Sequence, residues 1–177
     1  VTLGEDGGLR FAPTAEIERL RVRPLDPARG DSLELEVTVE MGTARTVTVG
    51  VRRSDDGSET TDIVYDADAQ TLTIDLSRSG DPAIHHRGWV ITPPKDPAVR
   101  DARHTEQRAP FSLAPGEALH LRIFVDRSIV EVYANGRRYL VQRVFPTRPD
   151  SLGVAVHADG AASVAWKAWE MAASNPF

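Results

Sequence analysis

LHLRIFVDRSIVEVYANGRRYLVQRV, residues 119–144, is the stretch that decides the fold of this chain. Apolar residues occupy every second position from Leu119 to Val125, which is the period of a β-strand with one buried face. Residues 129–133 and 139–144 are further strand candidates. Between the first two strands, Asp126-Arg127-Ser128 is typical of a tight turn, where a short polar side chain satisfies backbone donors. The stretch therefore predicts three consecutive antiparallel strands.

Asn135-Gly136 predicts the turn between the second and third of these strands. A two-residue type I′ hairpin needs positive φ at both central positions, and Asn-Gly is the pair that adopts it most readily. Such a hairpin pairs Ala134 with Arg137, so that Val132 faces Tyr139 and Val130 faces Val141. On the opposite face Glu131 would lie diagonal to Arg138, within reach of an ion pair.

The rest of the chain continues the β pattern. Strand-like segments cover residues 32–39, 46–51, 71–76, 152–157 and 162–169. Turn signals separate them, namely Asp55-Asp56-Gly57, Ser79-Gly80-Asp81-Pro82, Pro115-Gly116 and Asp159-Gly160. Only residues 14–22 suit a short helical turn, with Thr14 as its cap and Pro24 behind it. Many short strands with almost no helix predict an all-β fold, a two-sheet antiparallel β-sandwich of the lectin-like or jelly-roll-like kind.

Two segments stand apart from this pattern. Residues 1–13 carry Leu3, Leu9 and Phe11 among glycines and acidic residues, a poor pattern for an independent strand. We expect them to be a linker from a missing upstream domain, with the sandwich domain spanning residues 14–177. Residues 79–110 contain five prolines, and a loop of that length either contacts a ligand or a partner, or is a solvated insertion.

Composition excludes several classes of function. The chain has 177 residues, a net charge of −5 and no cysteine. The acidic balance argues against nucleic acid as a partner. The absence of cysteine rules out disulfides, thiol nucleophiles and cysteine-ligated metals. No apolar run is long enough to cross a membrane, so we predict no membrane partner. The chain begins at Val1 rather than methionine, and we expect it to be processed, excised or written without an upstream part.

Catalytic motifs are missing from the sequence. It has no phosphate-binding glycine loop, no GxSxG and no HExxH, and we predict neither a cofactor nor a metal site. Asp126 and Glu131 are the carboxylates that most resemble an acid–base pair. Both have a simpler structural explanation, because Asp126 sits in a turn and Glu131 has a nearby arginine.

The aromatic residues offer one candidate for carbohydrate binding. Exposed tryptophans stack against sugar rings, and Trp89 lies in the irregular segment, beside His86 and Arg87. We take these three residues as the candidate sugar site, with core packing of Trp89 as the open alternative. Trp166 and Trp169 are three apart in a strand and face opposite ways, so at least one is expected in the core.

The segment LRIFVDRSIVEVYANGR (residues 121–137), followed by QRVFPTRPDSLGV (residues 142–154), resembles the C-terminal β-sandwich of glycoside hydrolase family 32. That family includes invertases, levanases and inulinases. Three weaker segments match in the same order, namely AEIERLR (15–21), YDADAQTLTIDLSRSG (65–80) and AWKAWEM (165–171). The resemblance implies structural roles for a set of motif positions: Asp126, Arg127, Ser128, Glu131, Asn135, Gly136 and Arg143.

The resemblance also implies what this chain lacks. The family's catalytic residues lie on a β-propeller, in WMNDPNG, RDP and EC motifs, and none of these occurs here in its context. The implied function is a non-catalytic C-terminal module of a β-fructosidase that hydrolyses fructan or sucrose. Its implied partners are the catalytic propeller, a fructan or other carbohydrate and, as in some relatives, a second copy of the chain. The alternative is an independent lectin-like module. We expect a secreted or periplasmic location of bacterial type.

Overall fold

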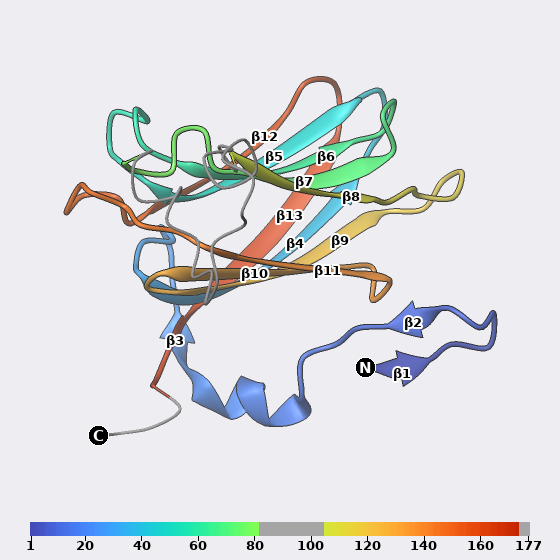
Figure 1. Cartoon of the computed structure of the whole chain (residues 1–177), viewed down its shortest axis with the longest axis horizontal. Helices are drawn as coiled ribbons and strands as arrows, with labels where there is room; N and C mark the ends of the chain where they lie inside the picture. Colours follow the sequence, from blue (N-terminus) through green and yellow to red (C-terminus); the bar gives the residue numbers. More distant parts are fainter. Residues whose placement is uncertain (82–104, 174–177) are drawn as a thin grey trace, which may run out of the picture.

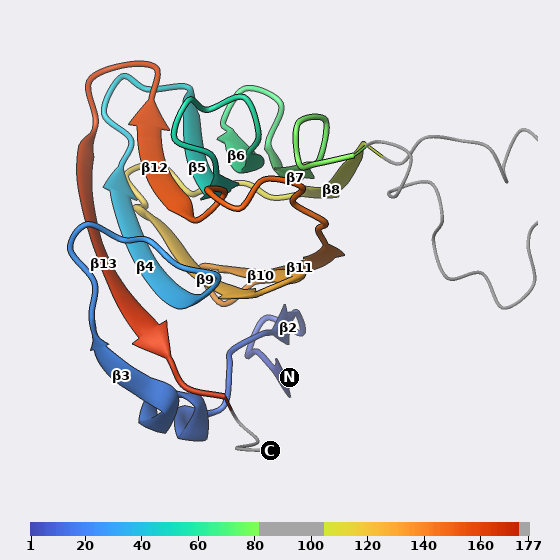
Figure 2. The same cartoon turned by 90° about the vertical axis from the view of Figure 1, so that its left-hand side faces the viewer.

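The computed structural model describes residues 1–81 and 105–173, and it forms two packed antiparallel sheets (Figures 1 and 2). The larger sheet has the order β11-β10-β9-β4-β13-β3, and the smaller has the order β12-β5-β6-β7-β8. The six strands of the larger sheet are β3 (Arg21–Pro24), β4 (Ser32–Glu40), β9 (Leu119–Asp126), β10 (Ile129–Ala134), β11 (Arg138–Arg143) and β13 (Ser163–Met171). The smaller sheet contains β5 (Thr46–Arg53), β6 (Thr61–Asp66), β7 (Thr71–Asp75), β8 (Glu106–Pro110) and β12 (Gly153–Ala158). The predicted β-sandwich is confirmed.

The core lies between the two sheets and follows the alternation of the sequence. On β4, Leu33, Leu35, Val37 and Val39 are almost completely buried. They meet the equivalent alternate residues of β5, β6 and β7, among them Val49, Ile63 and Ile74, which are fully buried. Strands β3, β6 and β8 were not predicted. β3 and β8 are short, and both lie at sheet edges where they bury little apolar surface.

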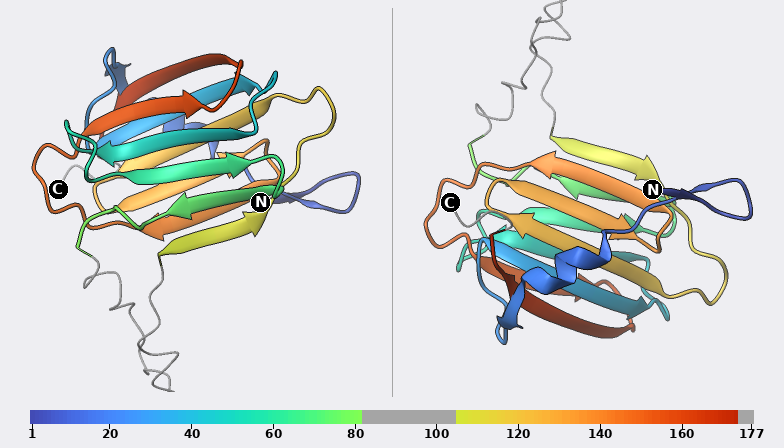
Figure 3. Two further views of the ribbon diagram at one scale, coloured as in Figure 1. Left: turned by 90° about the horizontal axis from the view of Figure 1, so that it is seen from above. Right: turned by 90° about the horizontal axis from the view of Figure 1, so that it is seen from below.

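The N-terminal residues form a small separate hairpin. β1 (Thr2–Leu3) and β2 (Leu9–Arg10) pair with each other and with no strand of the sandwich. The expectation that this segment would form no strand is therefore wrong. A 3-10 helix, η1 (Ala15–Leu20), follows it, and Thr14 makes no side-chain cap bond, contrary to the prediction. Figure 3 shows η1 running across the outer face of the larger sheet.

The β10–β11 hairpin has the predicted turn but a different register. Asn135 and Gly136 have φ values of 45° and 64°, and the Arg137 N–H donates to the Ala134 carbonyl at 2.9 Å. The ladder, however, pairs Ala134 with Arg138 and Val132 with Leu140. Arg137 is an extra residue on one strand, and a slip of one residue exchanges the two faces. Leu140 consequently enters the core, and Tyr139 moves to the outer face.

The predicted Glu131–Arg138 ion pair is wrong for the same reason. In the observed register Glu131 lies opposite Val141, and Arg138 lies opposite the buried Ala134. Successive side chains point to opposite faces of a strand, so Arg138 shares the face of Leu140 and not that of Glu131. Glu131 instead accepts hydrogen bonds from two tyrosines, described below.

Gly136→Ala should lower the free energy of unfolding by about 1–2 kcal/mol, because alanine at positive φ brings its Cβ too close to the backbone. The effect isolates backbone strain, since an added Cβ would meet only the Phe11 carbonyl oxygen, at 3.9 Å. Gly30→Ala is the matched control, as its Cβ would meet only Leu33, at 3.8 Å, without positive φ. Denaturant unfolding measures both variants, and equal losses would contradict the turn assignment.

Candidate functional site

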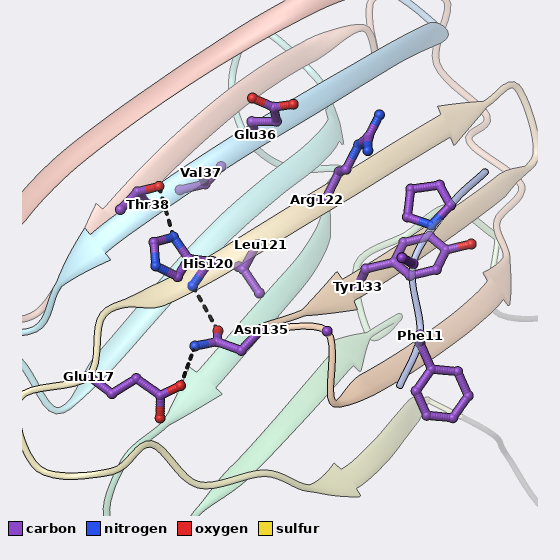
Figure 4. Close-up of a pocket in the computed structure, with 13 residues that line it drawn as sticks. Phe11, Glu36, Val37, Thr38, Glu117, His120, Leu121, Arg122, Tyr133 and Asn135 are labelled. Carbon is purple, nitrogen blue, oxygen red and sulfur yellow. Dashed lines mark hydrogen bonds between the residues drawn. The ribbon is translucent and has the colours of Figure 1, made fainter. Parts of the chain in front are cut away.

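The N-terminal segment leaves a hollow of about 510 Å³ above the outer face of the larger sheet (Figure 4). Phe11 and Pro13 form one wall, and strands β4, β9 and β10 form the floor. The polar side chains that face this hollow include Glu36, Thr38, Glu117, His120 and Arg122. Charged and polar side chains from several strands converge on it, so its chemistry is considered first.

Glu117 is held by a bidentate ion pair at the edge of the hollow. Arg137 Nη1 donates to Oε1 at 2.6 Å, and Arg137 Nη2 donates to Oε2 at 2.9 Å. Hydrogen bonds from Arg137 and from the Ala114 N–H lower the pKa of Glu117 to about 2. A carboxyl group with so low a pKa stays ionised and cannot act as a general acid near neutral pH.

Asn135 connects this ion pair to strand β9. Its Nδ2 donates to Glu117 Oε1 at 2.9 Å and to the Ala118 carbonyl at 2.8 Å. Its Oδ1 accepts a hydrogen bond from the His120 N–H at 2.8 Å. The His120 ring then contacts Thr38 Oγ1 through Nδ1 at 3.2 Å. Asn135 therefore fixes the wall of the hollow as well as allowing the turn.

Glu34 is a completely buried carboxylate on the outer face of β4. Arg21 donates to it twice, from Nε at 2.8 Å and from Nη2 at 2.7 Å, and Arg122 Nε donates at 2.5 Å. Burial alone would raise the pKa of Glu34, but these hydrogen bonds outweigh it and lower the pKa. The Arg21 guanidinium also lies over the Trp169 ring, 3.9 Å from its centroid. Arg122 also pairs with Glu18 of η1 at 3.4 Å, so the group holds η1 against the outer face of the larger sheet.

An aromatic patch continues from the hollow across β10 and β11. It consists of Phe11, Phe124, Tyr133 and Tyr139, with Phe11 stacked on Tyr139 at 6.2 Å and Tyr133 at 4.8 Å from Tyr139. Both tyrosine hydroxyls donate to Glu131 Oε2 at 3.2 Å. Burial and the nearby Glu131 charge raise the pKa of Tyr133 to about 12, so its hydroxyl remains a donor.

A second buried carboxylate, Glu59, lies at one end of the smaller sheet. It accepts hydrogen bonds from the Thr147 N–H at 3.0 Å, from the Thr147 hydroxyl at 2.6 Å and from the Arg148 N–H at 3.2 Å. The Ser151 hydroxyl donates to it as well. Burial alone would raise the pKa of Glu59, but these donors outweigh that effect and lower it.

The chemistry open to these groups is limited. Glycoside hydrolysis needs one carboxyl group with a raised pKa to protonate the leaving group. In residues 1–81 and 105–173, every carboxyl group whose pKa departs from its ordinary value is shifted downward. Those described residues also contain no cluster of three or more His, Asp or Glu side chains able to hold a metal ion. None of their helices is long and apolar enough to cross a membrane.

The structure separates the residues singled out from the sequence. Trp89, His86 and Arg87 lie outside the described residues. Asp126 and Ile129 close the tight turn through Arg127 and Ser128, and Arg127 has a φ of 51°. Arg143 places its guanidinium 5.1 Å from the Phe145 ring centroid. Asp126 and Glu131 share the outer face, where two tyrosines donate to Glu131. The Asp126 carboxylate makes no hydrogen bond within the described residues, so the expectation that it satisfies backbone donors of the turn is wrong.

The expectation that Trp166 or Trp169 enters the core is wrong. Trp166 is 40% exposed, and Trp169 is only partly buried beside Arg21. Sequence analysis also missed Glu34 and Glu59 as buried groups. Glu34 occupies a polar position in an alternating strand, a pattern that normally marks a solvent-facing residue, and nothing local signals that a second layer covers it.

The chain is similar in sequence and in fold to known glycosyl hydrolases. Residues 10–170 match the model for "Glycosyl hydrolases family 32 C terminal". No curated protein sequence matches. Solved structures similar to this chain include a sucrose-6-phosphate hydrolase from Lactobacillus gasseri, with 26% identity and a TM-score of 0.69 over 95% of this chain and 32% of that one.

Two further structures share the fold. Fructan 1-exohydrolase IIa from Cichorium intybus has 15% identity and a TM-score of 0.71, with coverage of 96% of this chain and 39% of that one. Exo-inulinase from Aspergillus awamori has 22% identity and a TM-score of 0.65, with coverage of 85% and 26%. The present chain thus spans between about a quarter and two fifths of the length of these proteins.

Proposed function

Because the chain belongs to the C-terminal domains of glycosyl hydrolase family 32, we propose that it is a non-catalytic module that packs against a catalytic domain and stabilises it. The reaction of that catalytic domain would be the hydrolysis of fructosyl linkages in fructan or sucrose. The observation that carries the proposal is the state of the carboxylates described above. Glu34, Glu59 and Glu117 are each saturated by donors, which suits a structural scaffold rather than acid–base chemistry.

The N-terminal hairpin and the aromatic patch form the surface that we assign to this packing. Leu3 is 73% exposed and Leu9 is 55% exposed, and the two lie opposite each other in the hairpin, so they form one exposed apolar pair. Phe11 connects them to the patch, since its N–H donates to the Gly136 carbonyl at 2.8 Å and its ring stacks on Tyr139. Contiguous exposed apolar surface marks interaction sites. In this proposal residues 1–13 are the segment that leads from the upstream domain.

A binding experiment in trans tests this packing surface. The catalytic domain of the enzyme that carries this module, expressed separately, should melt at a higher temperature when the 177-residue chain is added, because a ligand that binds only the folded state stabilises it. Replacing both Leu3 and Leu9 with aspartate should abolish the shift. Val22→Asp is the matched control, since Val22 is 60% exposed on β3, outside this surface. An equal shift with the double variant would contradict the assignment.

A further inference from the structure

Strand β13 has a free edge over its first five residues. It pairs with β4 along its whole length, from Ser163 to Glu170, but with β3 only from Trp169 onward. Figure 2 shows β3 beside the C-terminal end of β13 alone. Residues 163–167 therefore have no strand on their other side within the described part of the chain, and all five are exposed.

The direction of the free backbone groups follows from the neighbouring contact. The Leu25 N–H donates to the Ala168 carbonyl at 2.9 Å, so Ala168 points its backbone groups away from β4. Because the direction alternates along an antiparallel strand, Trp166 and Val164 also point their N–H and C=O groups outward. The same two residues carry exposed apolar side chains, 40% exposed for Trp166 and 38% for Val164.

The other sheet edges carry features that block pairing. β3 has Arg21, Arg23 and Pro24, β8 has Glu106, Arg108 and Pro110, and β11 has Arg138 and Arg143. β12 is interrupted by a register shift between Gly153 and Ala155. Charged residues, prolines and bulges of this kind are how proteins prevent association through strand edges. The free part of β13 has only Lys167, at its far end.

We propose that this edge is an interface between two copies of the chain, which pair antiparallel through β13 about a two-fold axis at Ala165. In that register Val164 lies opposite Trp166 of the second copy, and Trp166 lies opposite its Val164. Each such pair exchanges both backbone hydrogen bonds and satisfies all the outward groups of these residues. An aromatic side chain opposite a β-branched one is also a favourable cross-strand pair.

The residues on the axis and around it fit this register. Ala165 lies opposite Ala165 of the second copy, in a non-hydrogen-bonded pair. The Cα atoms of such a pair are about 4.5 Å apart, so a small side chain is needed. Lys167 faces Ser163 of the second copy, so no like charges meet. The pairing must end at residue 168, because Leu25 already bonds its carbonyl. A window of residues 163–167 has Ala165 at its centre, which selects this register over a shifted one.

The proposed interface is small, so we expect the two copies to associate weakly. Five paired residues bury less than the roughly 1,200–2,000 Å² typical of stable complexes, so the dimer forms and dissociates with concentration. A hollow of about 570 Å³ at the end of β3, lined by Leu25, Asp26 and Trp166, leaves room for the small residues Ala161 and Ala162 of the second copy. The two larger sheets then form one continuous sheet across the axis.

Sedimentation of the 177-residue chain over a concentration series tests the interface. The native chain should pass from 19.4 kDa toward twice that mass as concentration rises to about 0.5 mM, within the range of weak association. Val164→Pro should abolish the increase, since it removes only an outward N–H and leaves the bonds to β4 intact. Val164→Lys should do the same. Val141→Lys is the control, because Val141 is equally exposed, at 38%, on another edge.

A symmetric crosslink tests the register independently. The chain has no cysteine, so each variant carries a single thiol. Ala165→Cys should give a disulfide-linked dimer on mild oxidation, and Ser163→Cys should not, because that position faces Lys167 of the second copy. A chain that remains a monomer throughout, or equal crosslinking of both variants, would overturn the proposal. So would a tryptophan fluorescence change with inulin that Trp166→Phe abolishes, with no change on raising the protein concentration, which would assign the hollow to carbohydrate.

Discussion

Replacing Arg122 with methionine should lower the free energy of unfolding by about 3 kcal/mol. Glu34 is completely buried, and Arg122 is one of the two arginines that neutralise it. Removing one partner of a buried ion pair leaves an uncompensated charge, which costs far more than the net contribution of the pair. Methionine replaces the apolar stem of arginine and removes the guanidinium, so the loss reports mainly the charge and its hydrogen bonds.

Arg23→Met is the matched control for this measurement. Arg23 forms an ion pair with Glu170 at 2.7 Å, but the two side chains are 64% and 42% exposed. Exposed pairs contribute about 0–1 kcal/mol, so this variant should unfold almost like the native chain. Urea denaturation followed by tryptophan fluorescence measures both. Equal effects would mean that Glu34 is hydrated and that the Arg21–Glu34–Arg122 group does not lock η1 onto the sheet.

Glu59→Ala should destabilise the chain by about 2 kcal/mol, because four donors around a buried carboxylate, one of them the buried Ser151 hydroxyl, lose their acceptor at once. The affected groups are the Thr147 N–H and hydroxyl, the Arg148 N–H and the Ser151 hydroxyl. Asp55→Ala is the control, since the Asp55 carboxylate is 65% exposed and pairs only with Arg29 among the described ion pairs. A loss at Glu59 no larger than that at Asp55 would contradict its role as a buried acceptor.

The Glu59 carboxylate should make the chain less stable as the pH falls. Its pKa is lower in the folded chain than in the unfolded one, so the folded state holds the proton less tightly. The stabilisation is fully present above the unfolded value of about 4.5. It is lost as pH falls through the folded value. The free energy of unfolding should be measured at several values between about pH 6 and 3. Over this range it should fall less with decreasing pH in Glu59→Ala than in the native chain.

Alternation of apolar and polar residues was enough to predict the β-sandwich and most of its central strands. It worked for β4, β5 and β9 because each buries one face against the opposite sheet. It failed for Glu34, whose polar position indicated solvent, because η1 crosses that face and the Arg21 and Arg122 side chains cover the carboxylate. Alternation of apolar and polar residues identifies which face of a strand meets the core. It does not show whether another segment covers the opposite face.

Turn chemistry predicted the conformation of Asn135-Gly136 but not the register of the strands that it joins. The side chain of the extra residue, Arg137, binds Glu117, a contact between residues 20 positions apart that the turn sequence does not reveal. The choice between Tyr139 and Leu140 as the buried residue depends on space in the core, which the local sequence does not specify. Trp166 was misplaced for a related reason, since it lies on the core side of β13 but beyond the cover of the smaller sheet.

The release of fructose by the purified chain is the measurement that tests the central claim most directly. The chain is incubated with sucrose, inulin and levan, and free fructose is assayed against buffer alone. A non-catalytic module predicts no release above buffer with any of the three substrates, because no described carboxyl group has the raised pKa of a general acid. Release that Glu117→Gln or Glu131→Gln abolishes, in a variant that still folds, would contradict the account.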